Sequence, residues 1–344
     1  MPMKQKNIPR KNNRTTIIVI CALIAALIVG FLIWRDQKAQ SVYKVSEDIT
    51  PESDEGSYMM TYNGVEYEYN NNIMSVMLIG IDSTGKIEST DTYGDHARAD
   101  NIEILILDRK SNKVSIMPIS RDTITPVHKY SMNGYDMGTE DTHLGFAYSF
   151  GDGGKASCLN TQQAVTDLLY GVAPRYYFTT NLDSIAFLND LVGGVTVTVP
   201  NNDVAGVHPE LTKGNKVELN SGNAADFLRY RDTGAEYSNN GRMERQRAFL
   251  EAVIKKLSEM EAEEYEDMWK SINSKESNIL TNLSNGQFVQ ILDKIREYEI
   301  DPDTNVFNIE GENGSEDGYD VFYPDKDKLQ QLVIDTFFIK SGEI

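Results

Sequence analysis

The sequence predicts an α/β protein: a three-layer α-β-α sandwich around a mixed β-sheet, preceded by one N-terminal transmembrane helix. Two observations predict this fold class. Short runs rich in Val, Ile and Leu alternate with helix-like segments through residues 71–344, and strands interleaved with helices are typical of layered α/β domains. An uninterrupted apolar run at residues 17–34 precedes this region.

The apolar run at residues 17–34 is long enough to span a bilayer, since a helix of this length measures roughly 27 Å. Residues 1–14 contain five basic residues and no acidic one, which predicts a cytoplasmic N-terminus and an exported remainder. The alternative is a cleaved signal peptide, but its apolar region would be shorter and would end at small residues. Here Trp34, Arg35 and Asp36 follow instead. We therefore expect a cytoplasmic basic tail (1–14), a transmembrane helix (15–34), an extracellular spacer (35–70) and one folded domain (71–344).

The charge of the chain excludes some partners. Its formal net charge is -19, and an acidic exported domain will not bind nucleic acid or anionic lipid nonspecifically. Cys21 lies in the apolar run, so Cys158 is the only cysteine of the exported part. An exported, cysteine-poor protein is compatible with a Gram-positive cell surface.

The elements of the folded domain follow from the apolar pattern and the turn residues. We expect strands at residues 75–82, 101–108, 113–120, 176–181 and 195–199. We expect helices at residues 160–171, 183–194, 223–230, 242–260, 285–298 and 325–339. Residues 130–154 are rich in Gly and Tyr and predict either a lid or substrate loop or a plain ordered excursion.

Charged residues occur where the first three strands begin or end. Asp82 ends the first strand, Arg98 and Asp100 lie at the entry of the second, and Arg121 and Asp122 end the third. If the first two strands are antiparallel neighbours, Asp82, Arg98 and Asp100 meet at one edge of the sheet. Strand-end carboxylates are common ligands of hard divalent cations, although turn capping or ordinary ion pairs would also explain them.

A second cluster of charge lies at residues 228–247, which hold five arginines in an acidic chain. On a helix that begins at Arg242, this arginine and Gln246 share the inward face with Phe249 and Val253. A buried, unpaired charge is costly, and a helix N-terminus favours an anion. The region therefore predicts a pocket for a compact anion, with a surface ion-pair network as the alternative.

The motifs together are more specific than their parts. LIGID, RADN, ISRDT, THLGFAYSFG, LNDLVGGVTVTVP, FLRYR and GRMERQR occur in an order and spacing that resemble the LytR-CpsA-Psr family. This resemblance implies a cell-envelope phosphotransferase. Such an enzyme transfers a glycopolymer (teichoic acid, capsular or a related polysaccharide) from a polyprenyl pyrophosphate carrier to the C6 hydroxyl of N-acetylmuramic acid in peptidoglycan.

The resemblance also implies roles for individual residues and a Mg²⁺ cofactor. The metal ligands would be Asp82 and Asp100. The pyrophosphate would bind to Arg98, Arg121, Arg229, Arg231, Arg242 and Gln246. The catalytic residues would be Asp100, Arg121 and Asp122, with Asp100 preferred over Asp122 as the base.

The sequence departs from the family pattern at two places. Asn239 and Asn240 stand where the family commonly has an aspartate, and the loop between Asp82 and Arg98 is long and acidic. An apolar tunnel for the prenyl chain would involve residues 185–192, whose spacing an ordinary core explains equally well. Hydrolysis of polyprenyl pyrophosphate, or a non-catalytic polymer-binding or regulatory role, are the alternatives to transfer.

Overall fold

The structure is a computed structural model that describes residues 58–231, 238–274, 278–297 and 305–342. The tail, the transmembrane helix expected at residues 15–34 and the spacer up to residue 57 lie outside the described residues. Within the described ranges, no helix is long and apolar enough to cross a membrane.

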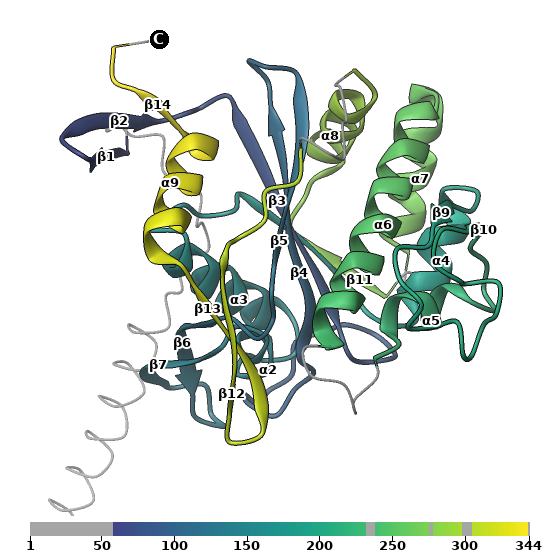
Figure 1. Ribbon diagram of the computed structural model, residues 1–344, viewed down its shortest axis with the longest axis horizontal. Coiled ribbons are helices and arrows are strands. Elements are labelled where there is room, and N and C mark those ends of the chain that lie inside the picture. Colours follow the sequence, from purple (N-terminus) through teal and green to yellow (C-terminus); the bar gives the residue numbers. More distant parts are fainter. Residues whose placement is uncertain (1–57, 232–237, 275–277, 298–304, 343–344) are drawn as a thin grey trace, which may run out of the picture. The chain divides into compact units, whose positions relative to one another are not determined.

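A five-stranded mixed sheet forms the centre of the fold (Figure 1). Its order is β11 (Ile279–Thr281), β8 (Tyr176–Thr180), β3 (Ile73–Ile81), β4 (Ala99–Asp108) and β5 (Lys113–Ile119). Strands β3 and β8 are parallel, and the other neighbouring pairs are antiparallel. Because β3 and β4 are antiparallel, the end of β3 meets the start of β4, and Gly80 pairs with Asn101.

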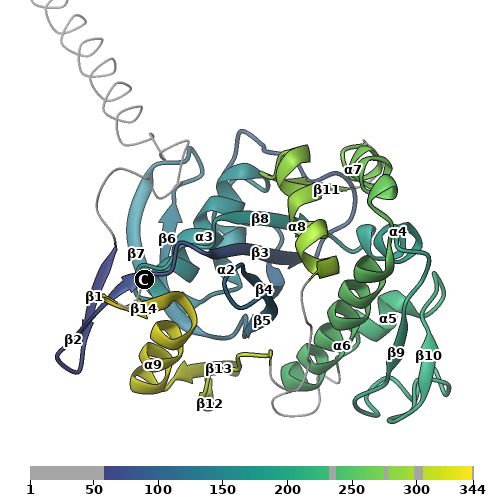
Figure 2. The same cartoon turned by 90° about the horizontal axis from the view of Figure 1, so that it is seen from above.

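Helices cover both faces of this sheet (Figure 2). Apolar side chains alternate along the strands: Val76 and Leu105 belong to one core, Met77 and Ile104 to the other. The first core is closed by α4 (Ser184–Leu191), α5 (Ala224–Arg229), α6 (Ser238–Glu259), α7 (Tyr265–Ile272) and α8 (Asn285–Glu297). The second is closed by α2 (Phe146–Ser149), α3 (Lys155–Leu168) and α9 (Lys326–Phe337).

Shorter strands surround this sandwich. Two hairpins are β6 (Ile124–Tyr130) with β7 (Asp136–His143), and β12 (Gly311–Glu316) with β13 (Tyr319–Pro324). A third antiparallel pair is β9 (Thr196–Thr198) with β10 (Lys216–Glu218), and a single 3-10 turn, η1 (Ala262–Glu264), precedes α7. A small sheet joins both ends of the domain: β1 (Met59–Tyr62), β2 (Val65–Tyr69) and β14 (Phe338–Lys340).

The structure confirms the expected α/β fold around a central mixed sheet, but it differs from the sequence prediction at three places. Residues 58–70, expected in the spacer, form β1 and β2 and pair with β14. Residues 130–154 are not one long loop, because β7 and α2 lie within them and account for about half of their length. Helix α6 begins at Ser238, one turn before the expected start.

Candidate functional site

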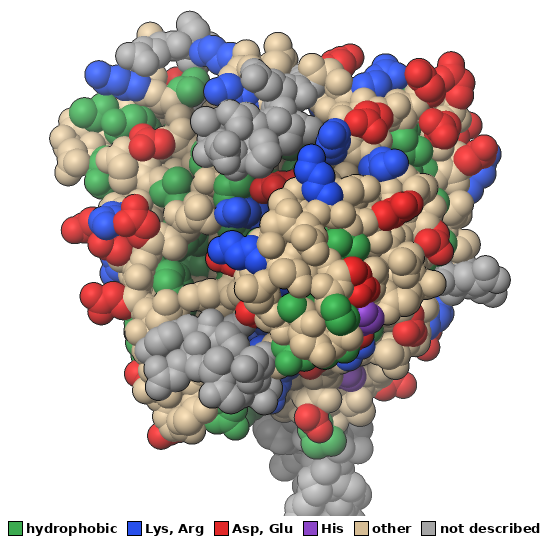
Figure 3. All heavy atoms as spheres, turned by 45° about the vertical axis from the view of Figure 1, so that its right-hand side comes forward, with side chains coloured by type: hydrophobic (Ala, Val, Ile, Leu, Met, Phe, Trp, Pro, Cys, Tyr) green, Lys and Arg blue, Asp and Glu red, His purple; other side chains and the backbone are tan. Residues whose placement is uncertain are grey.

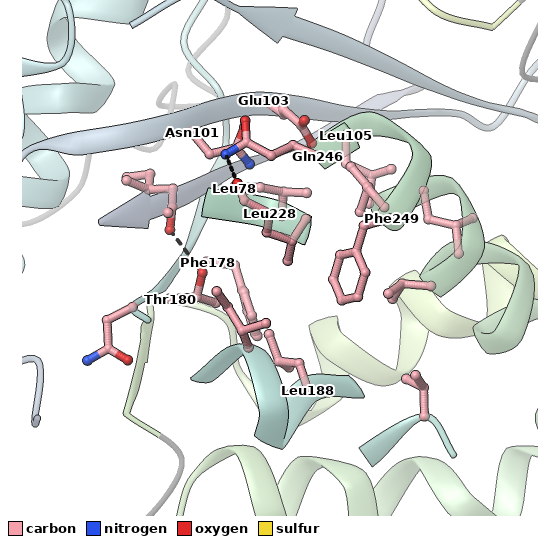
Figure 4. A pocket seen from close by; sticks show the side chains of 18 of the residues that line it. Leu78, Asn101, Glu103, Leu105, Phe178, Thr180, Leu188, Leu228, Gln246 and Phe249 are labelled. Atoms are coloured by element: carbon pink, nitrogen blue, oxygen red, sulfur yellow. Dashed lines mark hydrogen bonds between the residues drawn. The ribbon is translucent and has the colours of Figure 1, made fainter. Parts of the chain in front are cut away.

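A large cavity lies between the sheet and helices α4–α8. Its volume is about 700 Å³, within the usual range for small-molecule sites. Most of the wall is apolar, with Phe178, Leu188 and Phe249 among the lining side chains. Figure 4 shows these around the apolar part, while Asn101, Glu103 and Gln246 group on one side.

Charged residues gather at one end of this cavity. Polar lining residues come from the end of β3, the start of β4, the end of α5 and the second and third turns of α6. They include Asp82, Asp100, Arg229, Arg242 and Gln246. The face in Figure 3 shows Lys and Arg side chains near its middle, some beside a recess with hydrophobic side chains inside.

Asp100 holds two arginines together at the cavity mouth. Its Oδ1 accepts a hydrogen bond from Nη1 of Arg121, and its Oδ2 accepts one of 2.9 Å from Nη1 of Arg242. Arg242 is 4% exposed. Burial lowers the pKa of its guanidinium, an effect that the nearby Asp100 carboxylate opposes. A guanidinium from the turn after β5 and one from α6 therefore share one carboxylate.

Asp122 contacts this cluster but does not line the cavity. It is buried, which raises the pKa of its carboxyl, and Arg121 opposes that shift. Nδ2 of Asn239 donates to Oδ2 of Asp122 over 2.8 Å, while Oδ1 of Asn239 accepts from Nη2 of Arg242 over 2.7 Å. An amide can donate and accept at once, whereas an ionised aspartate could only accept. The departure from the family pattern at Asn239 thus joins Asp122 to Arg242.

Two polar atoms at the mouth lack partners among the described residues. These are Nε of Arg242 and Oε1 of Gln246, both buried. Nε2 of Gln246 donates to the carbonyl oxygen of Leu228 over 3.4 Å. A buried polar atom without a partner is costly, and neither atom has accessible surface of its own, so a ligand would contact the other nitrogen atoms of these two side chains.

The other predicted residues lie around this centre in different environments. Arg98 is exposed and its guanidinium lies 4.5 Å from the ring centre of Phe146, while its backbone N–H donates to Asp82 over 2.6 Å. Arg229 is exposed and lines the cavity. Arg231 forms an ion pair of 2.6 Å with Asp320 of β13. The cavity thus brings Asp82, Asp100, Arg229, Arg242 and Gln246 together, with Arg121 joined through Asp100, whereas Arg98 and Arg231 do not line it.

Two arginines of the same stretch have structural partners. Arg245 is fully buried and donates to Asp203 over 2.6 Å and to the carbonyl oxygen of Phe227 over 2.8 Å. Arg247 lies 3.4 Å from Glu251 on the next turn of α6. The dense run of arginines therefore contains both site residues and residues that stabilise the fold.

Sequence reasoning missed three residues beside the cluster. Asn239, His143 and Asp320 come from α6, β7 and β13, and Nε2 of His143 lies 2.9 Å from the carbonyl oxygen of Asp320. For Asn239 the departure from the family pattern was the available signal. Residues 311–324 carry no clear apolar pattern, so nothing in the sequence indicated that β13 would lie beside Asp122.

The fold and the site together define a layered α/β protein with a basic mouth on an apolar cavity, a site suited to an amphipathic anion. Residues 35–336 match the LytR_cpsA_psr family. The chain belongs to this family, as the resemblance of its motifs implied.

Similar proteins carry transferase names. The chain is 28% identical over 278 residues to a polyisoprenyl-teichoic acid–peptidoglycan teichoic acid transferase TagU of Bacillus mycoides, covering 78% of this chain and 79% of the relative. It is 25% identical over 288 residues to TagU of Bacillus subtilis, covering 81% of each. Two solved structures share the fold at 20% identity and a TM-score of 0.57. These are B. subtilis TagV, covering 78% of this chain and 96% of that one, and TagT bound to LIIa-WTA, covering 82% and 95%.

Proposed function

We propose that this protein transfers a glycopolymer from a polyprenyl pyrophosphate carrier to the C6 hydroxyl of N-acetylmuramic acid in peptidoglycan. The product would be a phosphodiester, and polyprenyl phosphate would leave. The TagU relatives, named as teichoic acid–peptidoglycan transferases, support the reaction class.

One observation carries the proposal: Arg229, Arg242 and Gln246 line one part of a cavity whose wall is otherwise mostly apolar. A lipid diphosphate has the same division, since its diphosphate carries about two to three negative charges and its isoprene units are apolar. The guanidinium forks of Arg121, Arg229 and Arg242 suit bidentate contact with phosphate oxygens. The isoprene units nearest the phosphates would lie against Leu188, Phe249 and Val253.

Mg²⁺ fits the mouth of the cavity. Asp82 and Asp100 both line it, and Mg²⁺ in phosphoryl-transfer sites is commonly held by one or two carboxylates together with substrate phosphates. Among the described residues no group of three or more His, Cys, Asp or Glu could hold a metal by itself. The remaining ligands would therefore be substrate oxygens and water. When bound, the ion would neutralise charge that develops on the diphosphate.

The protein groups would act mainly by position and charge. Phosphoryl transfer demands little covalent work from an enzyme, and fixed donors at the developing charge supply most of the acceleration. Arg121 and Arg242 would hold the phosphates in line. Asp100 lines the cavity and would act as the base after giving up one of its two arginine contacts, whereas Asp122 does not line the cavity and orients Arg121 and Asn239.

We further propose that residues 15–34 anchor the chain in the cell membrane as a single span. The N-terminus would be cytoplasmic and the folded domain outside, in a Gram-positive envelope. The basic residues before the apolar run support this orientation. The carrier lipid would then reach the cavity from the same membrane.

The test is an assay of the full chain in detergent with a labelled polyprenyl pyrophosphate-linked donor, with and without peptidoglycan glycan chains. A transferase consumes the donor faster when glycan is present and incorporates the label, and chelation with EDTA slows the reaction until Mg²⁺ is restored. Donor consumption that glycan does not accelerate would indicate hydrolysis, and no consumption would indicate a binding role.

Arginine variants connect this activity to the site. Arg121→Ala and Arg242→Ala should each lower the transfer rate by at least about 10²-fold. Arg109→Ala is the matched control, because Arg109 lies at the opposite end of β4 and contacts backbone oxygens of Asn71 and Asn72. Undiminished transfer in the Arg121→Ala, Arg242→Ala double variant would overturn the proposal.

A further inference from the structure

A strip of aromatic side chains lies beside the charged cluster. It consists of Phe146 of α2, His143 of β7 and Tyr319 of β13. The ring centres of His143 and Phe146 are 5.4 Å apart, and those of His143 and Tyr319 are 6.3 Å apart. Tyr319 is 61% exposed. The guanidinium of Arg98 lies over the far end, at Phe146.

The backbone fixes the aromatic strip to the residues of the proposed site. The N–H of Gly145, next to Phe146, donates to the carbonyl oxygen of Arg121 over 2.9 Å, and the N–H of Phe322 donates to that of Asp122 over 2.8 Å. A Cβ on Gly145 would lie 2.9 Å from the carbonyl oxygen of Ala99, so a glycine is needed for this close approach. The strip is therefore held rigidly beside Arg121 and Asp122.

The aromatic strip and the apolar cavity lie on opposite sides of the charged cluster. The cavity is enclosed by α4–α8, and none of the three strip residues lines it. Figures 1 and 2 both place α2, β7 and β13 across the strand ends from α5 and α6. In a phosphoryl transfer the attacking and leaving oxygens lie in line on opposite sides of the phosphorus. If the leaving polyprenyl phosphate occupies the cavity, the attacking hydroxyl arrives from the side of the strip.

The chemistry of the aromatic strip suits a sugar ring. One face of a pyranose presents C–H groups that pack on aromatic rings, and its hydroxyls and amide need polar partners at the edge. The strip offers the exposed ring and the hydroxyl of Tyr319 and the ring of His143, which meets both neighbours edge-on, while the guanidinium of Arg98 lies over the Phe146 ring. A neutral glycan backbone also avoids the repulsion that an acidic protein exerts on polyanions.

We propose that the aromatic strip binds the sugar rings of the acceptor glycan strand and holds its hydroxyl at the Asp100–Arg121 pair. This inference rests on the proposed transferase activity, because that activity makes the glycan strand the acceptor. Binding of glycan to the strip can nevertheless be tested by itself.

The kinetic test uses the full chain in detergent with a saturating lipid pyrophosphate-linked donor and a varied concentration of peptidoglycan glycan strands. Tyr319→Ala and Phe146→Ala should raise the KM for glycan by about tenfold, equivalent to about 1.4 kcal/mol per lost ring contact, and leave the KM for donor unchanged. Tyr319→Phe should keep the KM within about twofold, because the ring remains. Tyr323→Ala is the matched control: Tyr323 is an exposed tyrosine of the same strand but does not belong to the strip.

Each outcome of these measurements either supports or overturns the proposed glycan site. An unchanged KM for glycan in Tyr319→Ala and Phe146→Ala overturns the proposal, and a raised KM for donor alone assigns the strip to donor sugars instead. If the wild-type chain transfers nothing, titration of glycan fragments monitored by calorimetry still decides. Weaker binding by Tyr319→Ala than by Tyr323→Ala supports the strip, while equal or absent binding in the wild type and both variants overturns it.

Discussion

Glu103 offers the clearest test of how the cavity wall responds to pH. It lies in the middle of β4, is 2% exposed and lines the cavity. Burial raises the pKa of its carboxyl to about 7, and the nearby Glu251 adds to this, while Arg247 opposes it. Glu103→Gln keeps the size of the side chain and removes its titration.

The magnitude follows from the difference between the folded and unfolded pKa values. The usual pKa of a glutamate carboxyl is 4.5, so folding raises the pKa of Glu103 by about 2.5. Each unit corresponds to about 1.4 kcal/mol, which gives about 3 kcal/mol. Because the folded protein binds this proton more tightly than the unfolded chain, the stabilisation is present below pH 4.5. It is lost as the pH rises to about 7.

The assay is urea unfolding of the full chain in detergent at pH 4.5, 6 and 8. The wild-type protein should lose about 3 kcal/mol relative to Glu103→Gln between the lowest and highest pH, with most of the loss between pH 5 and 7. Comparison with the glutamine variant cancels the titration of groups that do not interact with Glu103; Glu251, which does, is part of the measured difference. A difference between the two proteins that stays constant with pH would refute the reasoning.

Three further variants test other contacts. Asn239→Leu removes the donor to Asp122 and the acceptor of Arg242. It should cost about 3 kcal/mol in urea unfolding, and a loss below 1 kcal/mol would mean that the bridge is not important. Arg245→Met deletes a fully buried guanidinium paired with Asp203 and should destabilise the fold by about 3–5 kcal/mol. A melting temperature equal to the wild type would contradict that assignment. Val253→Trp fills part of the cavity and should raise the KM for the lipid-linked donor about tenfold without changing the KM for glycan. An unaffected donor KM would place the lipid elsewhere.

Local pattern predicted the centre of the fold well, because the strands at its core carry a strong signal. Residues of β3, β4 and β5 alternate between two buried faces, and their polar ends carry Asp82, Asp100 and Arg121. Antiparallel pairing of β3 with β4 then brings Asp82 near Asp100 without further information. The inward face of α6, with Arg242 and Gln246 beside Phe249, was also predictable from helical periodicity.

The parts of the fold that the sequence did not predict depend on contacts between residues far apart in the chain. Residues 311–324 form a hairpin whose first strand, GENGSE, has no apolar residue. Its position follows from the contact of Phe322 with Asp122, which no sequence period reveals. The start of α6 was placed too late for a similar reason, since Ser238, Asn239 and Asn240 have weak helix propensity, yet Asn239 is held by tertiary hydrogen bonds. The metal and lipid roles depend on molecules outside the chain and stay predictions.

The pairing of β2 with β14 means that β2 is made long before the strand with which it pairs. Strand β2 leaves the ribosome about 270 residues before its partner at Phe338–Lys340, since Tyr69 pairs with Phe338. At about 5–20 residues per second this delay is on the order of tens of seconds. Throughout that interval one edge of β2 is an open template for other strands. Until β14 pairs with β2, this edge can pair with a strand of another chain, so β14 both completes the sheet and protects its edge.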